Sequence, residues 1–534
     1  MAKTPTDNKG KDISIILFLC NWSPHSAYHA LLDQGYAMPA QMRMIRIPCT
    51  GRITKALLFK AFEMGADGVA LLGCKSGTCR YGSGTDAATN NTEDTRKILD
   101  LAGIGPERMK MATFYPDETV ALKEFLETFR DEIIALGKSP VVPSGGLRLE
   151  DRTALPPFAE ILTRYNAYEC QDCGKCTASC PLALSGRPFS PRALVGAIIA
   201  GEAEKVNNDI WACLTCGICY DRCPSGVNFP DFVRDVRCEL IGSGERHATH
   251  GGFFQSLMRA MTSPDLRTRR WGGLPESVKT DPDSPILFFG GCAPFFDAFF
   301  RKHTGVGTTG ILEDSLRLLN FFDIRPAVLE HERCCGHDLL WSGDRENFLK
   351  LARLNVEAIR TRRTQEVITA CPECWRTLAV DYPAHGIDIG FKVTHLYEIL
   401  AEKIENGAFS FKPLERRFTF QDSCRMNRFE QLRDLPRRLI QRIAPDAFAE
   451  MKDHGASSIC CGNCAWIGCD AFSKAMQVNR LGQAHASGAE LLVTACPKCQ
   501  VHLRCAMEDP LRGEELEMEM MDLTGVIART LKWE

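Results

Sequence analysis

Most of the 26 cysteines in this 534-residue chain recur at fixed spacings, and cysteine thiolates are the usual ligands of iron–sulfur clusters. The pattern CxxCxxCxxxCP occurs twice, as Cys170, Cys173, Cys176 and Cys180 and again as Cys213, Cys216, Cys219 and Cys223. Three cysteines at such intervals bind one cubane cluster, and the fourth reaches the other. The spacing therefore predicts two 4Fe–4S clusters and does not suit zinc. One is bound by Cys170, Cys173, Cys176 and Cys223, the other by Cys180, Cys213, Cys216 and Cys219.

A second pattern, in which one cysteine is followed by CCG and then by CPxC, is also duplicated. The first copy contains Cys292, Cys334, Cys335, Cys371 and Cys374, and the second contains Cys424, Cys460, Cys461, Cys496 and Cys499. The offsets of 132, 126 and 125 residues indicate duplicated units. Because a cubane cluster needs four thiolates, the fifth is surplus or the cluster is not a simple cubane. The glycine lets the backbone turn tightly beside the two adjacent cysteines.

Four further cysteines lie near the start of the chain. Cys20, Cys49 and Cys74 each end an apolar, strand-like run, and Cys79 follows in a loop. The carboxyl ends of parallel strands share one edge of a sheet, so these thiols are expected to converge. Four thiolates suit a 2Fe–2S cluster or a tetrahedral zinc ion. Four unrelated core cysteines are the alternative.

Other residues near these motifs have simpler explanations. Cys238, Cys464, Cys469 and Cys505 stay unassigned, with packed thiols as the default, and Cys464, Cys469 and Cys505 are candidates for one alternative ligand. His337 and His395 are candidates for donating protons to a thiolate product, but a single histidine at such a place is more often structural. Residues 305–310 fit GxGxxG without directly following a strand, so they do not meet the requirements of a dinucleotide site.

Composition limits the class of protein. A formal charge of −3 offers no basic excess for nucleic acid. The polar start Met1–Asp12 and the short apolar run Ile13–Cys20 do not form a secretory signal, and no run approaches the roughly 20 apolar residues of a transmembrane helix. We therefore expect reduced thiols in a cytoplasmic protein rather than a secreted disulfide scaffold.

Apolar periodicity indicates the elements that carry these cysteines. Strand-like and helical runs alternate over residues 13–137, which predicts a mostly parallel sheet. The 32 residues between Cys180 and Cys213 are helical in pattern. Strand-like runs end at Cys292, Cys371, Cys424 and Cys496, so each five-cysteine set can gather at a sheet edge. A linker from Ser243 to Pro285 contains one short helical segment near residues 251–261.

We therefore expect a multidomain protein of the α/β and α+β classes. Residues 1–140 form a parallel-sheet α/β domain, and residues 150–245 form an α-helical domain that binds two clusters. Residues 285–405 and 415–534 form the two copies of a duplicated α/β domain.

Family resemblances agree with this division. The runs FLCNW, RIPCTGRI, KAFEMGADGVALLGC and GTCRYGSG closely resemble the delta subunit of methyl-viologen-reducing hydrogenase. That resemblance implies a 2Fe–2S cluster on Cys20, Cys49, Cys74 and Cys79. Family members usually read CNWC at the first site, whereas this chain has Ser23 in place of the second cysteine.

The remaining motifs resemble two components of heterodisulfide reductase. The helical two-cluster region is similar to the C subunit of that enzyme, and the duplicated motif is similar to the CCG domain pair of its B subunit. The second resemblance implies that each five-cysteine set binds a non-cubane 4Fe–4S cluster that acts in disulfide cleavage. The sequences after CCG, GHDLLWSGD and GNCAWIG, lack the glycine-rich tail that is frequent in that family.

Together the resemblances imply a natural fusion of three iron–sulfur modules in a hetero-oligomer. Electrons would come from a hydrogenase or formate dehydrogenase through a partner like the flavin subunit of heterodisulfide reductase, which would carry the FAD. Ferredoxin is a further expected partner, and flavin-based electron bifurcation would be possible. The acceptor would be a CoB–CoM-type or other thiol disulfide. The alternative is an iron–sulfur relay for a hydroxy-acid dehydrogenase or a quinone-linked complex, without disulfide chemistry. A zinc-stabilised scaffold is the least favoured interpretation.

Overall fold

The computed structural model describes residues 13–141, 158–202, 207–242, 247–268, 270–271, 273–407, 409–428, 430–509 and 513–533. The polar start Met1–Asp12 and most of the Lys138–Arg148 stretch lie outside this set. The chain forms two compact units, residues 1–155 and 156–534. The fold is mixed α/β with parallel sheets and many helices, which confirms the expected class at that level.

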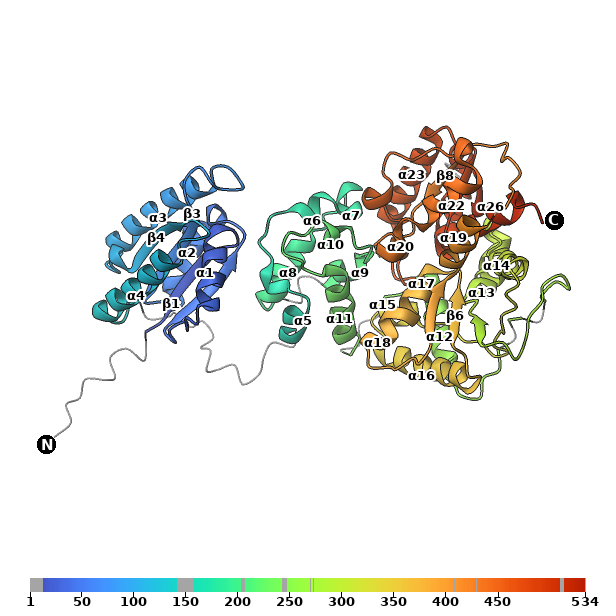
Figure 1. Ribbon diagram of the computed structural model, residues 1–534, viewed down its shortest axis with the longest axis horizontal. Helices are drawn as coiled ribbons and strands as arrows, with labels where there is room; N and C mark the ends of the chain where they lie inside the picture. The colour runs from blue at the N-terminus through green and yellow to red at the C-terminus, as the bar shows by residue number, and fades with distance from the viewer. Residues whose placement is uncertain are drawn as a thin grey trace. The chain divides into compact units, whose positions relative to one another are not determined.

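The N-terminal unit is a parallel four-stranded sheet with helices on both faces (Figure 1). The strands have the order β2-β1-β3-β4, and every pair is parallel. Helices α1 and α4 cover one face and helices α2 and α3 the other, each with its own apolar core. The elements are β1 (Ile15–Cys20), α1 (Ser23–Asp33), β2 (Met42–Ile47), α2 (Lys55–Glu63), β3 (Gly68–Cys74), α3 (Gly84–Leu101), β4 (Met109–Phe114) and α4 (Thr119–Leu136).

The second unit begins with short helices around the eight-cysteine region. These are α5 (Ala159–Arg164), α6 (Lys175–Ala178), α7 (Pro181–Leu184), α8 (Pro191–Ile199), α9 (Asn207–Ala212), α10 (Ile218–Asp221) and α11 (Phe229–Gly242). Gly174 and Gly217 precede α6 and α10 with left-handed backbone angles, φ 79° and 86°. Glycine adopts such angles at little cost, so the chain can turn sharply inside each cysteine motif.

The two five-cysteine repeats have the same topology, a three-stranded parallel sheet in the order β5-β6-β7 or β8-β9-β10. The first repeat contains β5 (Ile286–Phe288), α13 (Ala293–Thr304), α14 (Thr309–Phe321), α15 (His337–Trp341), α16 (Arg345–Thr361), β6 (Glu366–Thr369), α17 (Pro372–Arg376), η7 (Thr377–Asp381), α18 (Tyr382–Ala384), β7 (Lys392–His395) and α19 (Leu396–Asn406). The second contains β8 (Phe418–Gln421), α20 (Cys424–Asn427), α21 (Glu430–Arg433), α22 (Leu435–Ile443), α23 (Ala471–Ala486), β9 (Leu491–Thr494), α24 (Pro497–Met507), α25 (Gly513–Leu516), β10 (Glu519–Asp522) and α26 (Leu523–Thr530).

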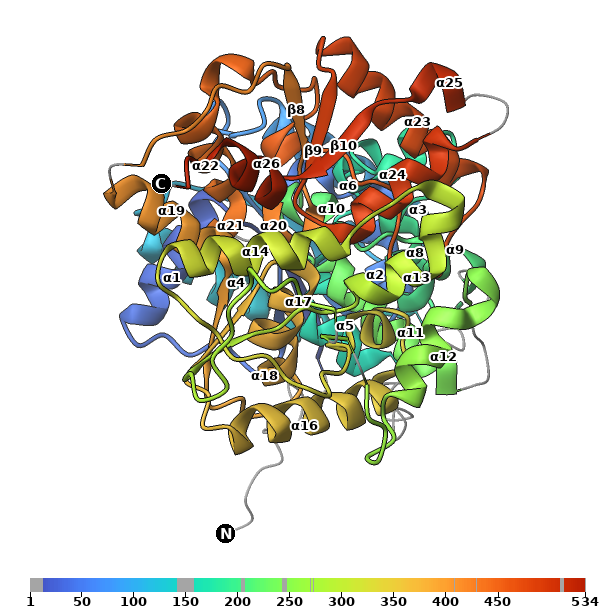
Figure 2. The same ribbon diagram turned by 90° about the vertical axis from the view of Figure 1, so that its right-hand side faces the viewer.

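One apolar core joins the repeats. Helix α14 packs on α26, as Figure 2 shows, and α19 packs on α22. Buried residues from both repeats, such as Leu319, Leu400, Leu439 and Ile527, belong to the same cluster. Each such side chain contributes about 1.5–3 kcal/mol by its burial, so the interface between the repeats is part of the fold itself.

The expected strands are all present, although several end before the cysteine that follows them. Strand β2 ends at Ile47, two residues before Cys49, and β6 ends at Thr369, two residues before Cys371. The segment expected to be a linker is also more structured than its composition indicates. It contains α12 (Phe253–Ala260), and its Gln255 and Thr268 are buried against the repeats.

Candidate functional site

The N-terminal unit brings its four predicted cysteines together in two close pairs. The sulfurs of Cys20 and Cys74 lie 3.7 Å apart, and those of Cys49 and Cys79 lie 3.8 Å apart. Electrostatic interaction of Cys49 with Cys20 and Cys74 links the two pairs. No disulfide joins them, because an S–S bond is about 2.05 Å long. Four converging, unbonded thiols at a sheet edge fit a bound metal or cluster.

Helix α3 begins directly at this sulfur cluster. A Cβ placed on Gly84, its first residue, would clash with the sulfurs of both Cys49 and Cys79, so only glycine fits. Burial would raise the pKa of the Cys79 thiol, but backbone N–H groups of Tyr81, Gly84 and Thr85 donate to its sulfur and lower the pKa overall. N–H groups at a helix start favour a thiolate over a neutral thiol. For Cys20, burial dominates and raises the pKa to about 12.

The eight cysteines of the helical region line two cavities. One cavity is lined by Cys170, Cys173, Cys176, Cys219 and Cys223. The other is lined by Cys180, Cys213, Cys216 and Cys219. Apart from Cys219, which lines both cavities, these are the two sets of four that the spacing predicts. Burial raises the pKa of Cys213 to about 12, so a bound metal must displace the proton and offset the buried charge.

In each repeat the five sulfurs form one continuous chain of contacts. The order is Cys292–Cys334–Cys335–Cys374–Cys371 in the first repeat and Cys424–Cys460–Cys461–Cys499–Cys496 in the second. Two of these sulfur pairs, Cys292 with Cys334 and Cys461 with Cys499, are 2.9 Å and 3.3 Å apart. The repeated order, without a disulfide, fits two clusters that are held in the same way.

The CCG turns are held by buried hydrogen bonds that differ between the repeats. Gly336 and Gly462 have φ angles of 87° and 85°. In the first repeat Tyr382 donates its hydroxyl to the Cys335 carbonyl at 2.8 Å. In the second, Nδ1 of His502 lies within hydrogen-bonding distance of the Cys461 carbonyl. Because a carbonyl only accepts, this His502 nitrogen carries the proton. The two CCG cysteine pairs are thus fixed by side chains that the cysteine motifs do not predict.

The second cavity of the helical region adjoins the second repeat. Cys216 interacts electrostatically with Cys424 and Cys460. Arg425, the residue after Cys424, donates to the carbonyl and hydroxyl of Thr215 at 2.6 Å and 2.9 Å. The Thr215 hydroxyl lies 3.1 Å from the sulfur of Cys464, one of the cysteines left unassigned by spacing. A sulfur-lined connection thus leads from the helical region to the second five-cysteine site.

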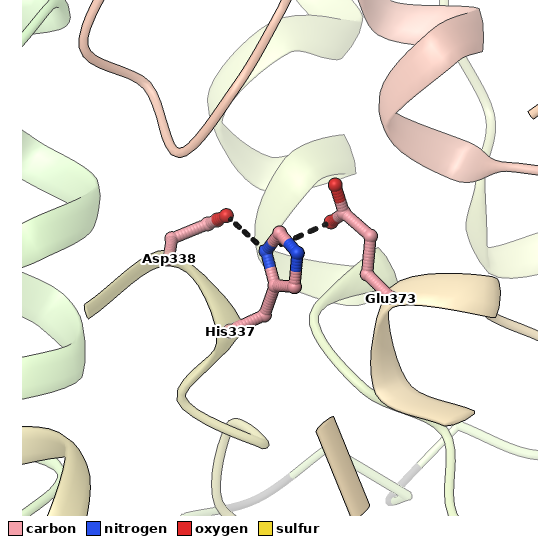
Figure 3. Close-up of side chains that lie close together, drawn as sticks. All are labelled: His337, Asp338 and Glu373. Carbon is pink, nitrogen blue, oxygen red and sulfur yellow. Dashed lines mark hydrogen bonds and ion pairs between the residues drawn. The ribbon is translucent and has the colours of Figure 1, made fainter. Parts of the chain in front are cut away.

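The two five-cysteine sites adjoin each other at Cys371 and Cys496, whose thiols interact electrostatically. Buried charged side chains surround this junction. Nδ1 of His337 lies 2.8 Å from Asp338 and 3.7 Å from Glu373 (Figure 3). These three residues could in principle hold a metal ion. Lys498, however, places its ammonium 2.5 Å from Asp338 and 2.7 Å from Glu373, so it already supplies the cation.

The geometry favours the structural interpretation of both histidines. Arg425 donates to Nε2 of His337 at 3.1 Å, so the proton of a neutral His337 lies on Nδ1, facing Asp338. His395 is fully buried and is the N-cap of α19, where its Nδ1 accepts from the Tyr397 N–H at 3.2 Å. Burial lowers the pKa of His395 to about 3.

Arg270, which the sequence patterns did not single out, lies beside the first five-cysteine site. Its guanidinium pairs with Glu332 at 2.8 Å, and both side chains are almost completely buried. Glu332 also accepts from the backbone N–H groups of Gly290 and Gly291 at 3.1 Å and 2.8 Å. Arg270 interacts electrostatically with Cys292 and Cys334. The sequence did not predict this contact, because Arg270 lies in the expected linker and no local pattern connects it to Cys292.

The GxGxxG segment lines a cavity between the repeats, but the backbone N–H groups at the start of the following helix, α14, already have an acceptor. The Asp297 carboxylate accepts from the N–H groups of Thr308 and Thr309 at 2.6 Å and 3.0 Å. A phosphate would need this position at the start of α14. This agrees with the rejection of a dinucleotide site.

The other unassigned cysteines have separate environments. Cys238 is on α11, and burial raises the pKa of its thiol to about 12. Cys469 is exposed, and with the half-buried Cys505 it lines a cavity. Within the described part of the chain, no helix combines the length and apolar character needed to cross a membrane.

Comparison with known proteins identifies three kinds of domain. Residues 15–137 match the family of the methyl-viologen-reducing hydrogenase delta subunit. Residues 166–227 match the 4Fe–4S dicluster domain, and residues 286–379 and 418–504 match the cysteine-rich domain. The chain therefore joins domains of all three expected families.

Several curated iron–sulfur proteins are similar to this chain. The D subunit of the dihydromethanophenazine:CoB–CoM heterodisulfide reductase of Methanosarcina barkeri is 27% identical, over 67% of this chain and 92% of its own length. The B subunit of the CoM/CoB fumarate reductase of Methanothermobacter marburgensis is 26% identical, over 66% and 71%. A probable membrane-anchored ferredoxin of Chromohalobacter salexigens is 24% identical, over 68% and 59%.

Proposed function

We propose that this chain, an iron–sulfur oxidoreductase subunit related to the D subunit of heterodisulfide reductase, reduces a disulfide at its paired five-cysteine sites. The observation that carries the proposal is the unbroken series of sulfur sites in the second unit. Cys216 of the helical region adjoins Cys424 and Cys460, and Cys371 of the first repeat adjoins Cys496 of the second. Electrons delivered singly can thus reach two neighbouring sites, as a two-electron cleavage requires.

The ligand assignments are part of this proposal. A 2Fe–2S cluster would be held by Cys20, Cys49, Cys74 and Cys79. Two cubane clusters would be held by the two cavity-lining sets, and a non-cubane 4Fe–4S cluster by each five-cysteine chain. Such clusters supply one-electron carriers and, at the five-cysteine sites, irons that can bind sulfur. The chain's own residues position the thiolates and bury them away from water.

The reaction consumes two electrons and two protons. The S–S bond of RS–SR′ breaks, each sulfur gains one electron and one proton, and the products are RSH and R′SH. The pairing of the sites across Cys371 and Cys496 suits this balance, because one sulfur of the substrate can face each site. Arg425 places a buried cation beside Cys424 and Cys464, where it offsets negative charge that accumulates on reduction.

The partners follow from the domain families. The delta-subunit-like domain would accept electrons from a hydrogenase or formate dehydrogenase, and an FAD-containing partner would link it to the helical region. Ferredoxin would be a further partner if the complex bifurcates electrons. We place the complex in the cytoplasm, where the many thiols would stay reduced.

Two measurements test the proposal. Anaerobically purified protein should be brown and contain about 18 irons per chain. The complete complex should oxidise reduced viologen with a thiol heterodisulfide such as CoB–CoM. Stoichiometric zinc without visible absorption would contradict every iron–sulfur assignment.

A relay without disulfide chemistry is the second candidate, and the similarity to a probable membrane-anchored ferredoxin favours it. In this case the chain would serve a hydroxy-acid dehydrogenase or a quinone-linked complex. A fully loaded complex that passes electrons to such an acceptor but never turns over a disulfide would identify the relay.

A further inference from the structure

The middle residues of the two CPxC motifs carry opposite charges and pair with each other. Glu373 lies between Cys371 and Cys374, and Lys498 lies between Cys496 and Cys499. They occupy equivalent places in the duplicated sequence, 125 residues apart, as the second residues of α17 and α24. Nζ of Lys498 lies 2.7 Å from Oε2 of Glu373. The ion pair therefore links the two cysteine sites directly.

This pair belongs to a buried charged group at the junction. Lys498 also contacts Asp338 at 2.5 Å, and Asp338 accepts from His337. The residue Lys498 is 2% exposed and Asp338 7%, so water has little access to these charges. The ammonium is thus held as a cation by two carboxylates.

Stability alone does not account for such an arrangement. Desolvation of buried charges costs several kcal/mol per ion, and apolar residues of similar volume often serve stability equally well. An ion pair does, however, fix relative position, because it holds two side chains at one distance from each other. Here the fixed side chains lie between ligand cysteines, at the starts of the two helices that present them.

Glu373 is also close to the sulfurs of the opposite repeat. Its charge acts on Cys424 and Cys496, both of the second site, although Glu373 belongs to the first. A shift of Glu373 relative to Lys498 would therefore change the separation of Cys371 and Cys496. We infer that Glu373 and Lys498 are positioning residues that hold the two five-cysteine sites in register, so that both sulfurs of one disulfide are engaged together. This inference rests on the proposed function.

The test separates two contributions of the pair: the charge that it adds to the buried group and the link that it makes between the two five-cysteine sites. Lys498→Met alone leaves the carboxylates of Glu373 and Asp338 buried without their ammonium and should reduce iron content. The double variant E373Q/K498M removes one charge of each sign, so the net charge of the group is unchanged, Asp338 keeps its contact with His337, and the bridge is lost. In the full-length, cluster-loaded chain it should keep the parent's iron content and lose the spin–spin interaction between the two reduced sites in EPR spectra. Disulfide turnover should fall about a hundredfold, as for a misplacement of about 1 Å.

Two further variants keep the result interpretable. Glu373→Asp retains the charge but shortens the side chain by one methylene. It should therefore fold, bind iron and show a weakened spin–spin interaction even if the double variant does not fold. E366Q/K392M removes the exposed pair between β6 and β7, whose charged atoms lie 2.9 Å apart, and should match the parent in every measurement.

The outcomes separate the two claims. A spin–spin interaction unchanged in E373Q/K498M, or absent from the parent, would overturn the positioning role. A parent that shows the interaction but no disulfide turnover would refute the proposed function alone, and the variants' spectra would still decide the role of the pair.

Discussion

The two five-cysteine repeats share the same order of sulfur contacts but differ in what surrounds it. In the first repeat the buried cation beside the cysteines is Arg270, which comes from the segment before the repeat and is bound to Glu332. In the second repeat it is Arg425, which comes from the repeat itself and reaches Thr215 in the helical region. The duplicated part is the sulfur site, and the specialised part is its connection to the rest of the unit.

This difference indicates a division of roles. Under the proposed function, the second repeat, whose Cys424 and Cys460 adjoin Cys216, receives electrons from the helical region. The first repeat, in which Arg270 and Glu332 pair beside Cys292, exchanges electrons with the second at Cys371 and Cys496. Replacing equivalent cysteines in the two repeats should therefore have equal effects. Replacing the buried cations beside those cysteines should have unequal effects.

The largest expected effect is loss of a ligand. Cys335→Ser and Cys461→Ser should each remove about four irons per chain and abolish disulfide turnover, because each site needs its adjacent cysteine pair. Iron analysis and the viologen assay measure this. Cys469→Ser, at an exposed unassigned thiol, is the control and should lose neither. Unequal effects of the first two variants would show that the sites are not equivalent.

The second largest expected effect is a loss of stability when a buried cation is removed, and this loss should differ between the two repeats. Arg270→Met leaves Glu332 buried without a cation and should destabilise the protein by about 3–5 kcal/mol. Arg425→Met loses hydrogen bonds to Thr215 and His337 without leaving a paired carboxylate, so we expect only about 1–3 kcal/mol. Anaerobic denaturant unfolding measures both. R270M/E332Q should recover most of the loss, and an equal cost for the two single variants would argue against the division of roles.

The N-caps at the ends of β7 and β10 should respond to pH in opposite directions. Burial raises the pKa of Asp522 to about 6, so its protonated carboxyl group contributes stability below about pH 4 that is lost as the pH rises through 6. Burial lowers the pKa of His395 to about 3, so its contribution is present above about pH 6.5 and is lost on acidification.

The variant Asp522→Asn isolates the first effect. Relative to the parent, its free energy of unfolding should increase by up to about 3 kcal/mol as the pH rises from 4 to 7. Denaturant midpoints measure this difference. His395→Asn should show the reverse trend and gain on the parent as the pH falls. Parallel curves for parent and D522N would exclude a raised pKa at this position.

The smallest effect concerns the contact between the helical region and the second repeat. Thr215→Val removes the hydroxyl that lies 3.1 Å from the Cys464 sulfur and accepts from Arg425. We expect a loss of about 1 kcal/mol with iron content unchanged. Thr163→Val, whose hydroxyl bonds only the Ala159 carbonyl within its own turn, is the matched control. A loss of iron in T215V would mean that Cys464 is a ligand.

Much of the fold was predictable because its signals are local. Alternating apolar runs predicted the parallel sheets, and the strand ends fell within two residues of Cys20, Cys49, Cys74 and Cys371. The segment at 251–261 was correctly expected to contain a short helix. Its role was not, because nothing local shows that Gln255 donates to the carbonyls of Ala465 and Trp466. The opposite charges within the two CPxC motifs are a local signal of the Glu373–Lys498 pair, but they do not show by themselves that the two motifs meet.

The sequence by itself determined which residue types recur and at what spacing, and hence the domain families, the duplication and the candidate ligands. These follow from short-range rules, since a cluster-binding motif or an amphipathic helix is written into neighbouring residues. Only the tertiary structure decided that Cys216 adjoins the second repeat, that Arg270 lies beside the first, and that Lys498 closes the junction between them. Such contacts join residues far apart in the chain, and packing of the core that the helical region shares with both repeats, rather than any local pattern, brings them together.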